Sequence, residues 1–154
     1  KISRVRDVGM PLKFYEEINT FKLFMLDVGL LGAISEMEPA QMLMSNNAMT
    51  ESKGAFTENY VLSQLKTLPG VVTYYYSRDD SRLEVDFMVQ HHGNITPVEV
   101  KAEENLRSKS LKAFMVKHED LHAVRFSMSP YRDQGWMTNY PLYAVRATFS
   151  DSLF

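Results

Sequence analysis

One short segment of the chain pairs an acid with an amine at a spacing that suits catalysis. Glu99 and Lys101 lie two residues apart in the segment Pro97-Val98-Glu99-Val100-Lys101-Ala102, which is typical of a β-strand. Because strand side chains alternate between faces, the acid and the amine share one face, and the two valines share the other. The same pattern also fits the solvent-facing side of an ordinary amphipathic strand.

A second acid, Asp86, lies in the segment before this one. Alternate residues around it predict one apolar strand face, made of Val85, Phe87 and Val89, with Asp86 on the opposite face. Asp is disfavoured inside strands, so its position calls for a reason. Residues 91–94 predict a tight reversal that pairs the two segments as a hairpin and brings Asp86 close to Glu99. Two carboxylates held together take up a proton or a cation.

A third acid, Glu58, lies in a predicted helix. The inward stripe of this helix is expected to consist of Ala55, Val61, Leu62 and Leu65. Glu58 falls within that stripe, where a carboxylate is costly unless an arginine, backbone donors or a metal ion compensates it.

Together these residues predict a divalent metal site. Oxygen ligands from Asp86, Glu99 and Glu58 suit Mg²⁺, or Mn²⁺ in its place. Lys101 would then orient a water molecule or neutralise charge that develops on a phosphoryl group. The chemistry indicated is metal-dependent hydrolysis of a phosphodiester, with Glu58, Asp86, Glu99 and Lys101 as the catalytic set.

The elements expected to position these residues alternate between helices and strands. From residue 50 onward we expect a helix over 50–68, strands over 71–76, 83–90 and 95–101, a helix over 106–117, and strands over 121–127 and 142–145. This order predicts an α/β domain with an α-β-β-β-α-β core, in which helices flank a mixed central sheet. Before it we expect an N-terminal helical extension: a short buried strand over 21–26, a helix capped by Asp27, and another helix beginning at Pro39.

At this point a family resemblance becomes visible. Asp86, a gap of twelve residues and Glu99-Val100-Lys101 resemble the D…E-x-K signature of the PD-(D/E)xK nuclease superfamily, which has a restriction-endonuclease-like fold. Glu58 takes the place of that superfamily's frequent helical acid. The residue before Asp86 is Val85, where the signature has Pro.

A narrower resemblance rests on an ordered set of strings: FKLFMLDVGLLGAI, KGAFTENYVLSQL, YYYSRDDSRLEVDFMV, PVEVKA and YPLYAV. They resemble a C-terminal domain of unknown function in bacterial and archaeal AAA-type ATPases. The resemblance implies that residues 1–49 are an extension or linker from an ATPase module missing here, as the first residue, Lys1, also suggests. Residues 50–154 would be the nuclease-like domain. The chain has no G-x-x-x-x-G-K-[ST] phosphate loop, so we expect no ATPase activity from it.

Composition narrows the function further. The chain has no cysteine, which excludes disulfides, zinc-thiolate sites and cysteine nucleophiles. Its net charge of −2 gives no global basic footprint for DNA. A local basic rim is expected near the site, made of Arg78, Arg82, Arg107, Lys109 and Lys112. We expect a cytoplasmic protein with no membrane segment, whose partners are DNA and the ATPase module.

Three functions are compatible with these observations. The first is a Mg²⁺-dependent nuclease domain attached to an ATPase. The second is a catalytically inactive accessory or interaction domain of that ATPase, which the acidic balance favours. The third is a DNA-binding module without cleavage, whose binding should depend strongly on salt.

Overall fold

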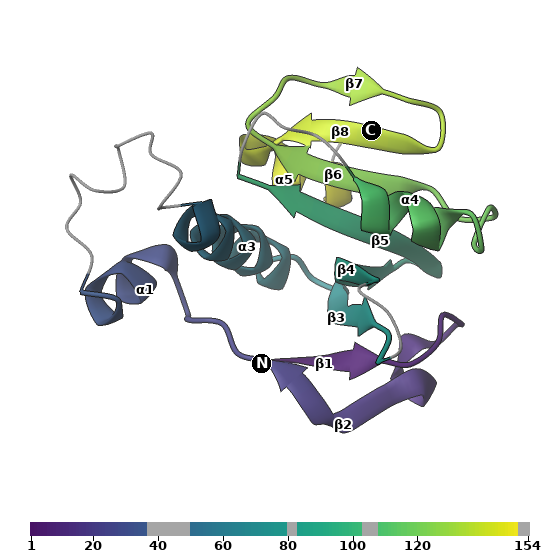
Figure 1. Cartoon of the computed structure of the whole chain (residues 1–154), viewed down its shortest axis with the longest axis horizontal. Coiled ribbons are helices and arrows are strands. Elements are labelled where there is room, and N and C mark those ends of the chain that lie inside the picture. Colours follow the sequence, from purple (N-terminus) through teal and green to yellow (C-terminus); the bar gives the residue numbers. More distant parts are fainter. Residues whose placement is uncertain (37–49, 80–82, 103–107, 151–154) are drawn as a thin grey trace.

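The described part of the computed structural model, residues 1–36, 50–79, 83–102 and 108–150, is built around one mixed β-sheet (Figure 1). The strands that it describes run in the order β2-β1-β3-β4-β5-β6-β8-β7. Their bounds are β1 Ile2–Val5, β2 Glu16–Lys22, β3 Val72–Ser77, β4 Glu84–His91, β5 Asn94–Lys101, β6 Ala123–Ser127, β7 Arg132–Asp133 and β8 Met137–Pro141. The pairs β1–β3, β5–β6 and β6–β8 are parallel, and the other neighbouring pairs are antiparallel.

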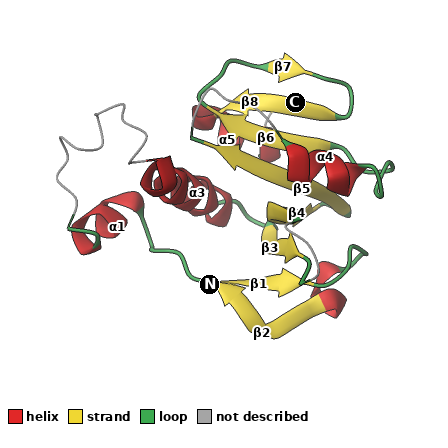
Figure 2. Ribbon diagram, in the orientation of Figure 1, coloured by secondary structure: helices red, strands yellow, loops and turns green. Residues whose placement is uncertain are grey.

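Helices cover both faces of this sheet (Figure 2). The described helices are α1 Val28–Ile34, α3 Thr50–Lys66, α4 Lys109–Met115 and α5 Val145–Phe149, with short 3-10 helices η1 Leu12–Tyr15 and η3 Leu142–Ala144. Buried residues of α3 and α5 pack on one face, in a core cluster with Phe87, Val98 and Val100. Buried residues of α4 pack on the other face, against Val85 and Met88. None of the helices in these ranges is long and apolar enough to cross a membrane.

The predicted order from Thr50 to Ser127 is confirmed at the level of elements. The structure has α3, β3, β4, β5, α4 and β6 in that order, and Thr50 is the first residue of α3. The reversal between β4 and β5 is a tight turn in which His92 and Gly93 have φ values of 47° and 75°. Positive φ at both central residues is the condition for the hairpin turn that matches strand twist. The predicted helix cap at Asp27 is also confirmed. Asp27 is the N-cap of α1, and its Oδ1 accepts a hydrogen bond of 2.8 Å from the Leu30 N–H.

The prediction of a strand over 142–145 was wrong. This segment forms η3 and the start of α5, and the strand that joins the sheet is β8, just before it. Pro141 explains the change, since it has no N–H to extend the ladder and its fixed φ suits the start of a helical turn.

The N-terminal segment also differs from the prediction of a helical extension. Two strands, β1 and β2, extend the sheet beyond β3, so this segment is not purely helical. The strand expected over 21–26 ends at Lys22, and Leu23 and Leu26 are exposed rather than buried. The helix predicted at Pro39 and the basic residues Arg82 and Arg107 lie outside the described residues.

Candidate functional site

Asp86 lies where β4 and β5 stop pairing. The paired residues run from His91 and Asn94 at the turn to Phe87 and Val98, and Asp86 is the next residue of β4. Its Oδ2 atom accepts a hydrogen bond of 2.7 Å from the backbone N–H of Val100. A carboxylate thus takes the place of a main-chain acceptor, and the two strands separate around it.

A β-bulge in β4 sets the position of this carboxylate. Between the pairs Tyr74–Met88 and Tyr76–Val85, β3 advances by two residues and β4 by three. Such an extra residue interrupts the alternation of side chains. Val85 therefore packs with the α4 side of the core, whereas Phe87 packs with the α3 side. The prediction that Val85 shares a face with Phe87 was wrong. Asp86 lies between these two residues, at the point where the side chains of β4 change face.

The surroundings of Asp86 favour its protonated form. Burial, together with the negative charges of Glu58 and Glu99, raises the pKa of Asp86 to about 7. The hydrogen bond from Val100 and the positive charge of Lys22 oppose this rise. Repulsion of this kind between neighbouring carboxylates is relieved by a proton or by a cation.

Glu58 approaches from α3. Burial raises its pKa, and Glu84 contributes to the rise, while Lys22 and Lys101 act against it. The predicted inward stripe is confirmed for Val61, Leu62 and Leu65, which are buried. It was wrong at Ala55, which is exposed. The next residue, Asn59, is buried instead, 2% exposed.

Glu99 is held from the other side of the sheet. Val98 and Val100 pack in the core cluster of α3, so alternation directs Glu99 and Lys101 toward the face that α4 covers. Glu99 is 6% exposed and accepts a short hydrogen bond from the hydroxyl of Ser108, the N-cap residue of α4. Lys101 Nζ lies 3.3 Å from its other carboxylate oxygen.

The four predicted site residues are therefore not placed on one face. Asp86 is the common member, because the charges of both Glu58 and Glu99 act on it. Within the ranges that the structure describes, no group of three or more His, Asp or Glu side chains is arranged to hold a metal ion. Joint ligation by Asp86, Glu99 and Glu58 thus stays a prediction.

The donor set nevertheless fits a hard cation bound by few protein ligands. Mg²⁺ is bound through oxygen, keeps several waters and needs only one or two carboxylates from the protein. Asp86 with either Glu58 or Glu99 meets that requirement. A cation would also relieve the repulsion that raises the pKa of Asp86.

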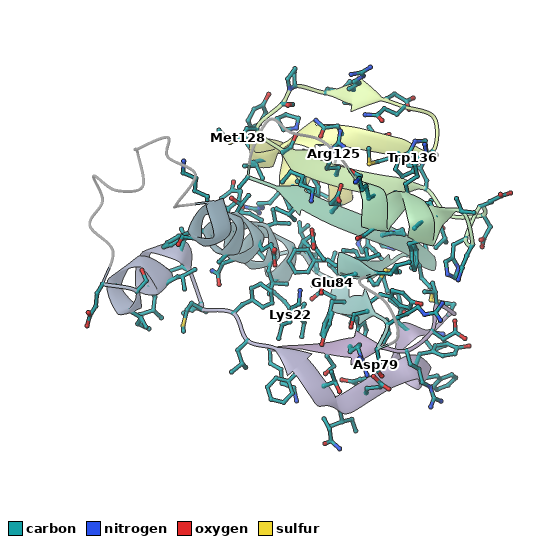
Figure 3. The ribbon with its side chains drawn as sticks, viewed as in Figure 1. Lys22, Asp79, Glu84, Arg125, Met128 and Trp136 are labelled. Atoms are coloured by element: carbon teal, nitrogen blue, oxygen red, sulfur yellow. The ribbon has the colours of Figure 1, made fainter. Side chains whose placement is uncertain are left out.

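Lys22, the last residue of β2, belongs to this site, although no local pattern predicted it. It forms an ion pair with Glu84, as Figure 3 shows, and its Nζ lies 5.0 Å from the ring centroid of Tyr75. Burial acts to lower the pKa of Lys22, but Glu84, Glu58 and Asp86 together raise it. Only the position of β2 at the end of the sheet brings this cation to the acids.

Arg125 is the second residue that the sequence did not reveal. Arg125 is labelled in Figure 3 and lies on β6. It is in register with Glu99 on β5 and is 1% exposed. Its Nη1 donates to the Ser108 hydroxyl at 3.0 Å, which in turn donates to Glu99. Its Nε donates to Asn139 Oδ1 at 2.9 Å. This chain of hydrogen bonds fixes the orientation of the Glu99 carboxylate.

Comparisons with known proteins give one match. Residues 53–145 match the model of a protein family described as a domain of unknown function (DUF4143). No curated protein and no solved structure matches the chain.

Proposed function

Because the chain belongs to the DUF4143 family, a domain of unknown function, we propose its activity from the site itself. The proposed activity is metal-dependent hydrolysis of phosphodiester bonds in nucleic acid. The observation that carries it is the Asp86 carboxyl group, held in the opening between β4 and β5 with its pKa raised to about 7 by burial and by Glu58 and Glu99. We also propose that the domain has a restriction-endonuclease-like topology and that it is attached to an AAA-type ATPase.

In this proposal each residue has a separate task. Asp86 would hold Mg²⁺ or Mn²⁺ together with Glu58 or Glu99. A bound divalent cation supplies Lewis acidity and a water of lowered pKa. Lys101, whose Nζ lies 3.3 Å from Glu99, is partly exposed and would neutralise charge on the phosphoryl group. Arg125 acts through Ser108 and is a positioning residue for Glu99.

The test is cleavage of plasmid and single-stranded DNA with millimolar Mg²⁺ or Mn²⁺. We expect Asp86→Asn and Lys101→Met to lower the rate on the order of 100-fold or more, the loss typical of removing one group that stabilises a transition state. The matched controls are Asp120→Asn and Lys117→Met, which alter exposed residues near α4 and should cleave like the wild type. Equal cleavage by all five proteins would identify a contaminant and end the proposal.

An exposed apolar surface supports a second candidate, a non-catalytic accessory domain. Helix α1 has no buried residue, and Leu26 just before it is 85% exposed. Exposed apolar surface that is contiguous is typical of a contact with another protein. This candidate would replace the first if calorimetry detected no Mn²⁺ binding at millimolar concentration while a Leu26→Lys change abolished association with the ATPase.

A further inference from the structure

A cleft of about 340 Å³ lies beside Glu58, lined by the segment after β2 and by α1 and α3. One part of its lining is apolar, from Leu23, Phe24 and Leu31, and another part is polar, from Lys22, Glu58 and Asn59. This volume lies near the lower end of the range of about 300–1,000 Å³ found for small-molecule sites. Glu58 belongs both to the cleft and to the candidate metal site, so the two share one residue.

Asn59 points to a ligand in this cleft. Its Oδ1 accepts a hydrogen bond of 2.8 Å from the Met25 N–H, which fixes the orientation of the amide. Its Nδ2 is buried and donates to no acceptor among the residues that the structure describes. Buried polar groups are nearly always hydrogen-bonded, so a buried donor of this kind beside a cleft suits a ligand group that supplies an acceptor.

The charges around the cleft select an uncharged ligand group. Lys22 is already paired with Glu84, and Glu58 adds a carboxyl group, so no unpaired cation among the described lining residues would attract a phosphate. Phe24 offers an aromatic ring, and the remaining apolar side chains suit a flat hydrophobic body. A planar ring that carries a hydrogen-bond acceptor at its edge fits these features, and every nucleobase has this form.

We propose that this cleft receives an unpaired nucleobase of a single-stranded nucleic acid, with an acceptor on its edge bonded to Asn59 Nδ2. The inference rests on the proposed function and names the substrate class of the same site. Leu23, which lines the cleft and is 73% exposed, can turn aside to admit the base without loss of core packing. Since all four bases carry acceptors, the cleft recognises an unpaired base rather than one sequence.

The test is binding of labelled single-stranded DNA, followed by fluorescence anisotropy in EDTA so that no cleavage occurs. Ala55→Trp fills the cleft from an exposed position of α3, and Ala113→Trp places the same ring on an exposed position of α4, outside the cleft. We expect Ala55→Trp to bind about tenfold more weakly than Ala113→Trp, the effect of losing about 1.4 kcal/mol. A duplex of the same sequence should bind both proteins equally.

A second comparison isolates the amide donor. Asn59→Asp keeps the oxygen that accepts from Met25 but removes Nδ2. Wild-type protein should prefer an intact strand over an abasic one by about tenfold, and Asn59→Asp should lose that preference. Any general repulsion by the new charge weakens both strands alike and leaves the ratio unchanged.

Equal binding by Ala55→Trp and Ala113→Trp would overturn the inference, and so would the absence of a wild-type preference for intact strands. A dimer that is disrupted only by Ala55→Trp would also overturn it, by assigning the cleft to a second copy. Each of these outcomes leaves the nuclease proposal standing, because that proposal is judged by the cleavage rates of Asp86→Asn and Lys101→Met.

Discussion

Replacing Asp86 with asparagine should stabilise the metal-free protein at alkaline pH and leave it nearly unchanged at acidic pH. The side chain keeps its shape, and its amide oxygen can still accept the hydrogen bond from the Val100 N–H. What disappears is the negative charge that Glu58 and Glu99 repel. The substitution therefore removes a repulsion and barely changes the size of the side chain.

The magnitude follows from the pKa of Asp86, which lies at about 7 in the folded chain against an ordinary value of 3.8. Because the folded-state value is the higher one, the group's contribution to stability is complete below pH 4 and is lost as the pH rises toward 7. Each unit of pKa difference corresponds to about 1.4 kcal/mol, so the full loss in the free energy of unfolding is roughly 4 kcal/mol. Asp86 keeps part of its surface accessible to solvent, so we expect about half of this, roughly 2 kcal/mol.

The assay is urea unfolding of both proteins in EDTA at pH 5 and at pH 8. At pH 8 the free energy of unfolding of Asp86→Asn should exceed that of the wild type by roughly 2 kcal/mol, or about 4–8 °C in Tm for a domain of this size. At pH 5 the difference should fall to roughly 1 kcal/mol, because pH 5 lies above the ordinary value of 3.8 and only part of the loss has occurred there. Asp120→Asn, at an exposed position, should change stability by no more than about 0.5 kcal/mol at either pH. A variant less stable than the wild type at pH 8 would refute the reasoning.

Three further predictions concern the same site. Millimolar Mn²⁺ should raise the Tm of the wild type but not that of Asp86→Asn, by scanning calorimetry, since only a native-state site is stabilised by its ligand; equal shifts would argue against a cation at Asp86. Lys22→Met should lower the unfolding free energy by about 1–3 kcal/mol in urea, because it removes the cation paired with Glu84 and one of the two lysines that act on Glu58, while Lys117→Met should have little effect. Arg125→Met should cost about 3–5 kcal/mol in the same assay, because it removes a buried cation together with the donors to Ser108 and Asn139; a loss below about 1 kcal/mol would mean that the network carries little energy.

The elements of the central segment could be predicted because their signals are local. Strands β4 and β5 each show β-branched and apolar alternation, and the Gly93 turn between them has a known backbone requirement. The hairpin that brings Asp86 near Glu99 is therefore encoded over a short stretch. The register could be inferred from the turn, and it held as far as the pair Phe87 and Val98.

The structure differs from the prediction where it depends on features that leave no local signal in the sequence. Alternation assumes a regular ladder, and the bulge opposite Tyr74 and Tyr76 depends on the pairing with β3, which a reading of β4 alone does not include. Buried valines can face either side of a sheet that is covered on both faces. The spacing of Glu99 and Lys101 was thus interpreted correctly within β5, but the covering helix on that face, α4 rather than α3, could not be inferred.

Lys22 shows most clearly how the remaining part of the site arises. Its neighbours in sequence are apolar, and nothing local separates it from a surface lysine. It reaches Glu84 because β1 inserts between β2 and β3 and so fixes where β2 ends relative to β4. The acids of the site are supplied by residues 58–99, yet the cation that most opposes their repulsion comes from residue 22. Removing β1 and β2 should therefore raise the pKa of Asp86 further, even though every predicted catalytic residue would remain.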